Sequence, residues 1–151
     1  MLALVGFVGL CLLVGAAGGA IMAGTDRGWY ASLVRPPGTP PNWVFGPVWT
    51  CLYALIGVAG WMVWRRTTAT RPLRLWGWQL AANAFWVPAF FALRSPLLAL
   101  ADMIVLLVLT LLTIRAFAPV QRLAAWLMAP YLAWICLAAY LTAGFWWLNP
   151  S

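Results

Sequence analysis

Residues 29–53 read WYASLVRPPGTPPNWVFGPVWTCLY, and this stretch carries a polar, proline-rich segment into a long apolar run. Each proline at positions 36, 37, 40 and 41 fixes φ and lacks an N–H donor, so no regular helix is expected there. We interpret the segment as a lid at a membrane surface that leads into a wall inside the membrane. Phe45, Trp49 and Tyr53 then follow at four-residue spacing on one helical face, which needs a packing partner.

The composition places the whole chain in a membrane. Of 151 residues, 66% are hydrophobic and 7% are charged, which suits a single integral membrane domain over residues 1–151. The net charge of +7 comes from arginines that lie mostly at the ends of apolar runs, so it marks loops facing lipid headgroups and not a nucleic-acid surface. Cys11, Cys51 and Cys136 lie in apolar segments without CxxC spacing, which favours packing over disulfides or metal.

Five apolar runs predict an all-α bundle of five transmembrane helices, at about residues 1–24, 43–64, 75–93, 96–117 and 123–148. The first run would span about 36 Å as a helix. Because it lacks a basic start and is too long for the apolar part of a signal peptide, a retained helix is favoured. Gly15 with Gly19, and Ala16 with Ala20, form small-xxx-small patterns that suit close packing within the fold or in a homodimer.

The arginines also predict an orientation. With the amino terminus inside, the second and fourth loops hold six arginines inside and leave three outside. The usual excess of positive charge on cytoplasmic loops favours this arrangement, in which the proline-rich loop faces away from the cytoplasm. The second loop is expected to contain Arg65, Arg66, Arg71 and Arg74.

The third run carries two amides and two aromatic rings on one helical face. Gln79, Asn83, Trp86 and Phe90 are spaced i, i+4, i+7 and i+11. An unpaired amide in hydrocarbon is costly, so Gln79 and Asn83 are expected to face the bundle, bonded to neighbouring helices or to a ligand. For either amide alone, bonding between helices is the favoured role. Pro88 removes one backbone hydrogen bond from this helix.

The fifth run carries a second aromatic stripe, Tyr131 and Trp134, which continues to the smaller Ala138 and to Leu141. Placed opposite Trp49, these rings would line a mostly apolar cavity that suits a flat hydrophobic molecule. The alternative is packing of ring on ring without a ligand, which periodicity alone slightly favours.

Asp102 is the one acidic residue inside a predicted span and is a candidate functional group for that reason. Pairing with Arg94 or Arg35 and a role in ligand or proton handling are equally consistent with its position. The sequence holds no histidine, no cluster of metal ligands and no phosphate-binding glycine loop, so conventional acid–base hydrolysis and a metal site are not expected.

Several motifs fall in order along nearly the whole chain: WYxxLxRP at 29–36, PPxWxFxPVWTxLY at 40–53, WxxQLxxNxxWxPxFF at 76–91, PYLAW at 130–134 and WxLN at 146–149. Together they resemble the TspO/MBR family of translocator proteins and tryptophan-rich sensory proteins. The resemblance implies a five-helix bundle, commonly a homodimer, whose first loop caps a pocket for tetrapyrroles such as protoporphyrin IX and haem. It also implies binding of sterols and synthetic isoquinolines, and a bacterial envelope membrane, with a cytoplasmic amino terminus if that is the inner membrane.

The resemblance also assigns residues to the pocket. Those that match its lining are Tyr30 at the lid, Trp49, Tyr53, Asn83, Trp86, Phe90, Leu98, Ala101, Trp134, Ala138 and Leu141. Arg35 or Tyr30 would meet a propionate of the ligand. Because histidine is absent, haem would be held by stacking and polar contacts and not by the commonest axial ligand. Two positions depart from the family: Gly38, where an aromatic residue is usual, and Thr142, where asparagine is frequent.

Three functions follow as competing expectations. The first is a membrane receptor, transporter or stress sensor that binds a tetrapyrrole and needs no cofactor. The second is an enzyme that degrades porphyrin in light with oxygen, in which Trp49 and Trp134 are redox-active rings. The third is a structural or regulatory membrane partner whose aromatic residues only form the core.

Overall fold

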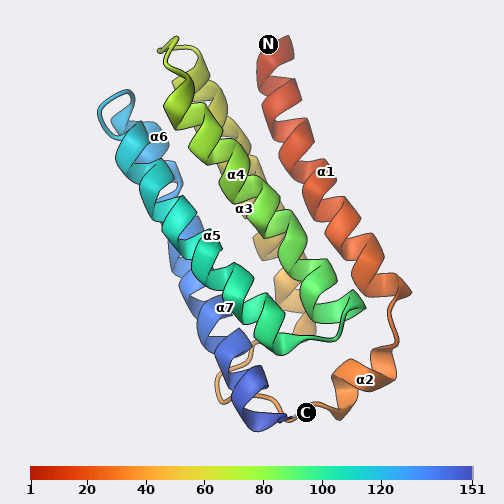
Figure 1. The fold of residues 1–151 in the computed structure, drawn as a ribbon. Helices are drawn as coiled ribbons and strands as arrows, with labels where there is room; N and C mark the ends of the chain where they lie inside the picture. The colour runs from red at the N-terminus through yellow and green to blue at the C-terminus, as the bar shows by residue number, and fades with distance from the viewer. Residues whose placement is uncertain (151) are drawn as a thin grey trace.

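The computed structural model describes residues 1–150, and every regular element in that range is a helix. The long helices form one bundle, and the amino and carboxyl termini of the chain lie at its opposite ends (Figure 1). The short helix α2 (Arg27–Ser32) lies at the end of the bundle where α7 finishes. The other elements are α1 (Leu2–Gly24), α3 (Asn42–Trp64), α4 (Thr70–Val87) with the π-helix η1 (Pro88–Ala92), α5 (Pro96–Phe117), α6 (Arg122–Leu127) and α7 (Ala129–Leu148).

Four segments are long and apolar enough to cross a membrane: α1, α3, α5 and the run Arg122–Leu148. The chain is therefore an integral membrane protein with several spans. The helix α4 is not among the four, because two arginines and two amides make it more polar than its neighbours. The expectation of five spans is thus supported for four of the segments.

The segment between α1 and α3 is partly helical. Trp29 and Tyr30, expected in an irregular loop, lie in α2, which begins where the Asp26 carboxylate accepts a hydrogen bond from the Gly28 N–H at 2.8 Å. Asp26 caps the helix by accepting from a backbone N–H of its first turn. The helix ends at Ser32, before the first of the four prolines. The irregular part is the shorter stretch 33–41, which holds the four prolines.

Two other boundaries differ from those expected. Arg71 and Arg74, placed in a loop by their charge, lie in the first turns of α4, where Pro72 is tolerated because N–H groups of a first turn have no helical acceptor. The last expected helix is interrupted at Met128, between α6 and α7. Pro130 has no N–H to bond the carbonyl four residues earlier, which accounts for the break.

The helix α4 continues into η1 at Pro88, where proline lacks the N–H that an α-helix would use. The wider π-helical turn is closed by the Leu93 N–H, which donates to the Pro88 carbonyl at 2.9 Å. It brings three consecutive residues, Ala89, Phe90 and Phe91, into the core. Arg94 then takes a positive φ of 49°, and Ser95 caps α5 by accepting from the Leu98 N–H at 3.2 Å.

Close contact between α1 and α3 depends on glycine. A methyl group added at Gly57 would lie 2.6 Å from Val8 Cα, so only glycine allows the two backbones to approach this closely. The two glycines of the small-xxx-small pattern on α1 have different surroundings. Gly15 lies against the Tyr53 ring inside the fold, whereas a methyl group added at Gly19 would meet no atom within 4 Å.

The three cysteines are free thiols. Cys11 is fully buried in the core, which confirms its predicted packing role. The same prediction is wrong for Cys51 and Cys136, which are exposed on α3 and α7 because their positions face away from the bundle.

Candidate functional site

A chain of hydrogen bonds crosses the centre of the bundle and joins α3, α4 and α7. The Tyr53 hydroxyl donates to Asn83 Oδ1 at 2.5 Å, and Asn83 Nδ2 donates to the Tyr131 hydroxyl at 3.0 Å. The Tyr131 hydroxyl in turn donates to Gln79 Oε1 at 2.9 Å. Gln79, Asn83 and Tyr131 are all buried, which confirms that the amides face the bundle and bond between helices.

Aromatic rings from α3 and α7 pack beside this network. We call Trp49, Tyr53, Tyr131 and Trp134 the inner ring cluster. The Trp49 ring is central, with its centroid 5.4 Å from that of Tyr53 and 6.3 Å from that of Tyr131. Its plane is perpendicular to that of Trp134, at a centroid distance of 6.5 Å. The expectation that the stripe on the last helix lies opposite Trp49 is confirmed.

A second group of rings lies towards the end where α2 sits; we call it the lid ring cluster. Phe90 is its centre and stacks on Trp86 at 5.3 Å with 18° between the planes. The rings of α2 reach it from outside the bundle, with the Trp29 centroid at 5.7 Å and the Tyr30 centroid at 6.4 Å from that of Phe90. Phe91 and Phe145 complete the cluster.

Three buried N–H groups beside these rings have no hydrogen-bond acceptor within residues 1–150. They are Trp86 Nε1, Trp134 Nε1 and Gln79 Nε2. A buried donor without an acceptor costs free energy, so its presence in a native core needs an explanation. Trp86 and Trp134 are among the residues expected to line a ligand pocket, and Gln79 lies one helical turn before the expected lining residue Asn83. A ligand in such a pocket would supply acceptors for these donors.

The structure gathers most of the expected pocket residues in the two ring clusters and the hydrogen-bond chain. Ala138 packs against the inner core and Leu141 is buried with Phe90, whereas Leu98 and Ala101 are exposed on α5. Rings of the inner cluster contact one another directly. Two open hollows lie elsewhere on the surface, one beside Phe7 on α1 and the other along α4. None of the expected lining residues borders either hollow.

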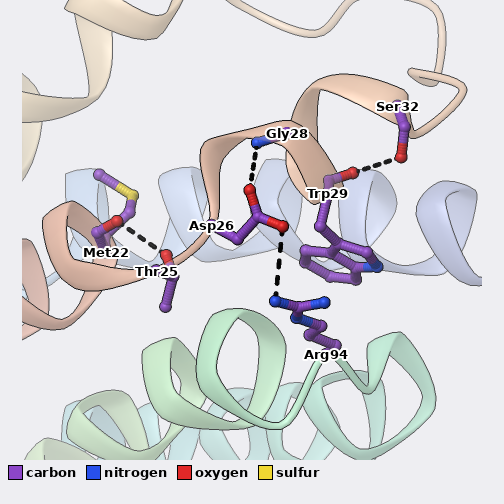
Figure 2. A network of polar contacts seen from close by, with 7 residues as sticks. All are labelled: Met22, Thr25, Asp26, Gly28, Trp29, Ser32 and Arg94. Atoms are coloured by element: carbon purple, nitrogen blue, oxygen red, sulfur yellow. Dashed lines mark hydrogen bonds and ion pairs between the residues drawn. The ribbon is translucent and has the colours of Figure 1, made fainter.

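Asp102 does not form the ion pair considered for it with Arg94 or Arg35. Within residues 1–150 its Oδ2 is buried without a partner. Arg94 instead points to α2, where its guanidinium lies 3.6 Å from the Asp26 carboxylate and 5.9 Å from the centre of the Trp29 ring (Figure 2). Arg35 lies over the ring of Tyr30 at 5.2 Å.

The proline-rich stretch 33–41 is attached to α7. The Val34 N–H donates to Asn149 Oδ1 at 2.8 Å, and Asn149 Nδ2 donates to the Val34 carbonyl at 3.0 Å. Pro36 is buried in a notch at Gly144, where an added methyl group would lie 2.5 Å from the proline ring. Further along, the Tyr140 hydroxyl donates to the Pro37 carbonyl at 3.0 Å.

The proline-rich stretch contains a tight turn at Gly38. Gly38 has φ +81° in a turn closed by the Thr39 N–H, which donates to the Pro36 carbonyl at 3.3 Å. Proline followed by a residue with positive φ is the pattern of a type II turn. An aromatic residue at position 38 would strain this turn.

The Tyr30 hydroxyl on α2 has a shifted pKa. Burial raises the pKa of Tyr30 above its ordinary value, and the nearby Arg35 guanidinium partly offsets this increase.

Comparison with known proteins identifies the family of the chain. The profile of the TspO/MBR family matches residues 7–148. The chain belongs to the TspO/MBR family. It is 38% identical to the tryptophan-rich protein TspO of Chlorobaculum tepidum over 95% of this chain and 93% of that protein. It is 37% identical to the bovine translocator protein over 94% and 87%, and 37% identical to TspO of Archaeoglobus fulgidus over 99% and 98%.

The family motifs contain residues whose structural roles were not predicted. Asn149 ends the WxLN motif. Its two hydrogen bonds to the backbone of Val34 explain why an amide side chain is needed at this position. Gly144 and the pairing of Arg94 with Asp26 had no signal in the sequence, because each depends on a partner far away in the chain. Tyr131 was expected as a ring in a stripe, whereas its hydroxyl is also the centre of the buried polar chain.

Proposed function

We propose that this chain binds a tetrapyrrole, protoporphyrin IX or haem, within the membrane and acts as its receptor, transporter or stress sensor. One observation carries the proposal: the buried N–H donors of Trp86, Trp134 and Gln79 lie beside two clusters of aromatic rings without an acceptor within residues 1–150. Flat ring faces suit a macrocycle, and the donors suit its acceptor groups. Membership of the TspO/MBR family supports the same conclusion.

Binding requires the inner ring cluster to open, because its rings now fill the space between α3 and α7. Trp49 and Trp134 would part to accept the ligand between them. The stretch 33–41 covers the carboxyl end of α7 and is held there by hydrogen bonds near the surface. Release of this stretch is therefore the simplest route by which a ligand would enter. Nine of the eleven expected lining residues are kept in this proposal, and the exposed Leu98 and Ala101 are the exceptions.

The lid supplies groups for the acidic edge of such a ligand. The Arg35 side chain is exposed and lies over the Tyr30 ring, so its guanidinium is positioned to pair with a propionate. The chain has no histidine, so binding of haem would rely on ring stacking and these polar contacts.

The membrane arrangement belongs to the same proposal. Helix α4 with η1 covers Thr70–Ala92, about 34 Å as a continuous helix, which is long enough for a fifth span. Its two amides, Gln79 and Asn83, are buried inside the bundle and do not face lipid. The open face at Gly19, with the exposed Ala16 and Ala20, offers a surface for a homodimer.

The distribution of arginines between the two sides of the membrane favours a cytoplasmic amino terminus. The proposed location is a bacterial envelope membrane.

A titration of the purified protein with protoporphyrin IX in the dark tests binding. Saturable quenching of tryptophan fluorescence is expected, with weaker affinity in the Trp134→Ala variant, which loses both a ring and a donor. Trp126→Ala is the matched control, since that exposed side chain lies on α6, outside both ring clusters. Absence of saturation in the wild-type protein, or equal affinity of both variants with it, would leave only a structural role for the rings.

A second candidate function is light-dependent oxidation of porphyrin by dioxygen. The observation that favours it is the contact of Trp49 with three other oxidisable rings, Tyr53, Tyr131 and Trp134. The titration repeated under light separates the two functions. A new absorption spectrum that depends on the protein and is lost in Trp49→Phe indicates catalysis, whereas unchanged porphyrin bands indicate a carrier or sensor.

A further inference from the structure

Arginines gather at the end of the bundle that holds the amino terminus, and no acidic side chain lies near them. The acidic residues are Asp26, which precedes α2 at the opposite end, and Asp102, early in α5. Within residues 1–150 the one ion pair joins Asp26 to Arg94, also at that opposite end. The arginine-rich end contains the α3–α4 connection and the passage from α5 to α6 (Figure 1), with Arg65, Arg66, Arg71, Arg74, Arg115 and Arg122.

Two of these arginines line an open hollow on the surface of α4. Arg71 and Arg74, together with Leu75 and Trp78, surround a hollow of about 290 Å³. Their spacing of i, i+3, i+4 and i+7 places all four on one face of the helix. Both arginine side chains are exposed, and the Trp78 side chain is 63% exposed. An apolar ring and two charges without counter-charges therefore share one open site.

The order of these residues along α4 matches the layers of a bilayer surface. The helix starts at Thr70, so Arg71 is outermost and Trp78 lies deeper by about 10 Å of helix. Guanidinium groups bind phosphate oxygens in a bidentate manner, at the depth of lipid headgroups. Tryptophan favours the boundary below the headgroups, where the acyl chains begin.

We propose that this face of α4 binds the headgroup of an anionic phospholipid of the surrounding bilayer. The phosphate lies between Arg71 and Arg74, and the upper acyl chains contact Leu75 and Trp78. Charge complementarity selects the lipid, because a zwitterionic headgroup carries its own cation whereas two unpaired guanidiniums attract net negative charge. The site is separate from the proposed tetrapyrrole pocket, since no expected lining residue borders it.

Native mass spectrometry of the whole protein, exchanged into an equimolar mixture of phosphatidylglycerol and phosphatidylcholine, tests the site. Wild-type protein should prefer phosphatidylglycerol by about twenty-fivefold, since each of the two arginines at the membrane surface contributes about fivefold. The double variant Arg71→Gln with Arg74→Gln should lose most of this preference. Arg115→Gln with Arg122→Gln removes the same charge at the same end of the molecule and should keep it.

Two results would overturn the proposal. One is a wild-type protein that retains both lipids equally. The other is an equal loss of preference in the two double variants, which would mean a diffuse effect of net charge and no site on α4. If the first double variant does not fold, the single variants Arg74→Gln and Arg122→Gln make the same comparison, with about a fivefold loss expected only for Arg74→Gln.

Discussion

Asn149 pairs with Val34 through both sides of its amide, across 115 positions of sequence. The Val34 N–H donates to Oδ1 at 2.8 Å, and Nδ2 donates back to the Val34 carbonyl at 3.0 Å. The same Nδ2 also donates to the Phe145 carbonyl at 3.0 Å, which holds the side chain against its own helix. The end of α7 is therefore the support on which the proline-rich stretch 33–41 rests.

The Asn149→Ala substitution should release this stretch while leaving the bundle folded. Two hydrogen bonds to Val34 are lost, so amide exchange of residues 33–41 should accelerate by on the order of tenfold. Hydrogen–deuterium exchange of the protein in detergent measures this. Asn42→Ala is the control, because the exposed Asn42 side chain makes no hydrogen bond within residues 1–150. Unchanged exchange at residues 33–41 would mean that other contacts alone hold the segment.

Removal of the Tyr131 hydroxyl should destabilise the bundle. Tyr131→Phe leaves Asn83 Nδ2 without an acceptor and Gln79 Oε1 without a donor, both in the buried core. The loss should be about 1 kcal/mol, since hydrogen bonds between membrane helices contribute about 0.6 kcal/mol each on average. Unfolding in mixed micelles measures the change in free energy.

Tyr140→Phe is the matched control for this substitution. It removes a hydroxyl of the same kind from the same helix, but that hydroxyl bonds the Pro37 carbonyl at the surface. Its effect on unfolding of the bundle should be smaller. If both variants unfold alike, the buried polar chain contributes no more than a surface contact.

The sequence predicts this interior only in part, and the reason is physical. The sequence of one helix is enough to predict that Gln79 and Asn83 lie inside the bundle, because an unpaired amide in hydrocarbon costs free energy. The cost of an unpaired amide does not predict which residue of another helix the amide will bond. Periodicity predicts that Tyr131 belongs to a stripe of rings, but it does not predict that the hydroxyl of Tyr131 bonds amides from another helix.

The fold shows the same division between local and distant information. The bounds of α3 follow from its apolar run. Charge alone predicts a loop at Arg71 and Arg74, because it does not distinguish the polar first turn of a helix from a connection between helices. Close approach of Gly57 to Val8 joins two helices, and the sequence holds no pattern that links those two positions. The contact between the Trp49 and Trp134 rings likewise depends on how α3 and α7 pack together.

Gly57→Ala should destabilise the contact between α1 and α3. The added methyl group would lie 2.6 Å from Val8 Cα, and backbone atoms cannot yield as a flexible side chain would. Overpacking of this kind costs about 1–3 kcal/mol, so a clear fall in melting temperature in detergent is expected. Gly46→Ala, on the same helix with nothing within 4 Å of the added methyl group, should not lower it, because alanine favours a helix over glycine. An equal fall in both variants would assign the effect to the helix itself and not to the contact.

Asp26 has two partners that substitution can separate. Its Oδ1 accepts from the Gly28 N–H at the start of α2, and its Oδ2 lies 3.6 Å from Arg94 Nη2, with both side chains at least half exposed. Exposed ion pairs contribute less than about 1 kcal/mol, whereas loss of a helix cap costs about 1 kcal/mol. Asp26→Ala should therefore accelerate exchange of the Gly28 amide several times more than Arg94→Gln does. Asp26→Asn keeps an acceptor without the charge and should behave like Arg94→Gln. Equal acceleration in Asp26→Ala and Arg94→Gln would instead identify the ion pair as the contact that holds α2 against the turn before α5.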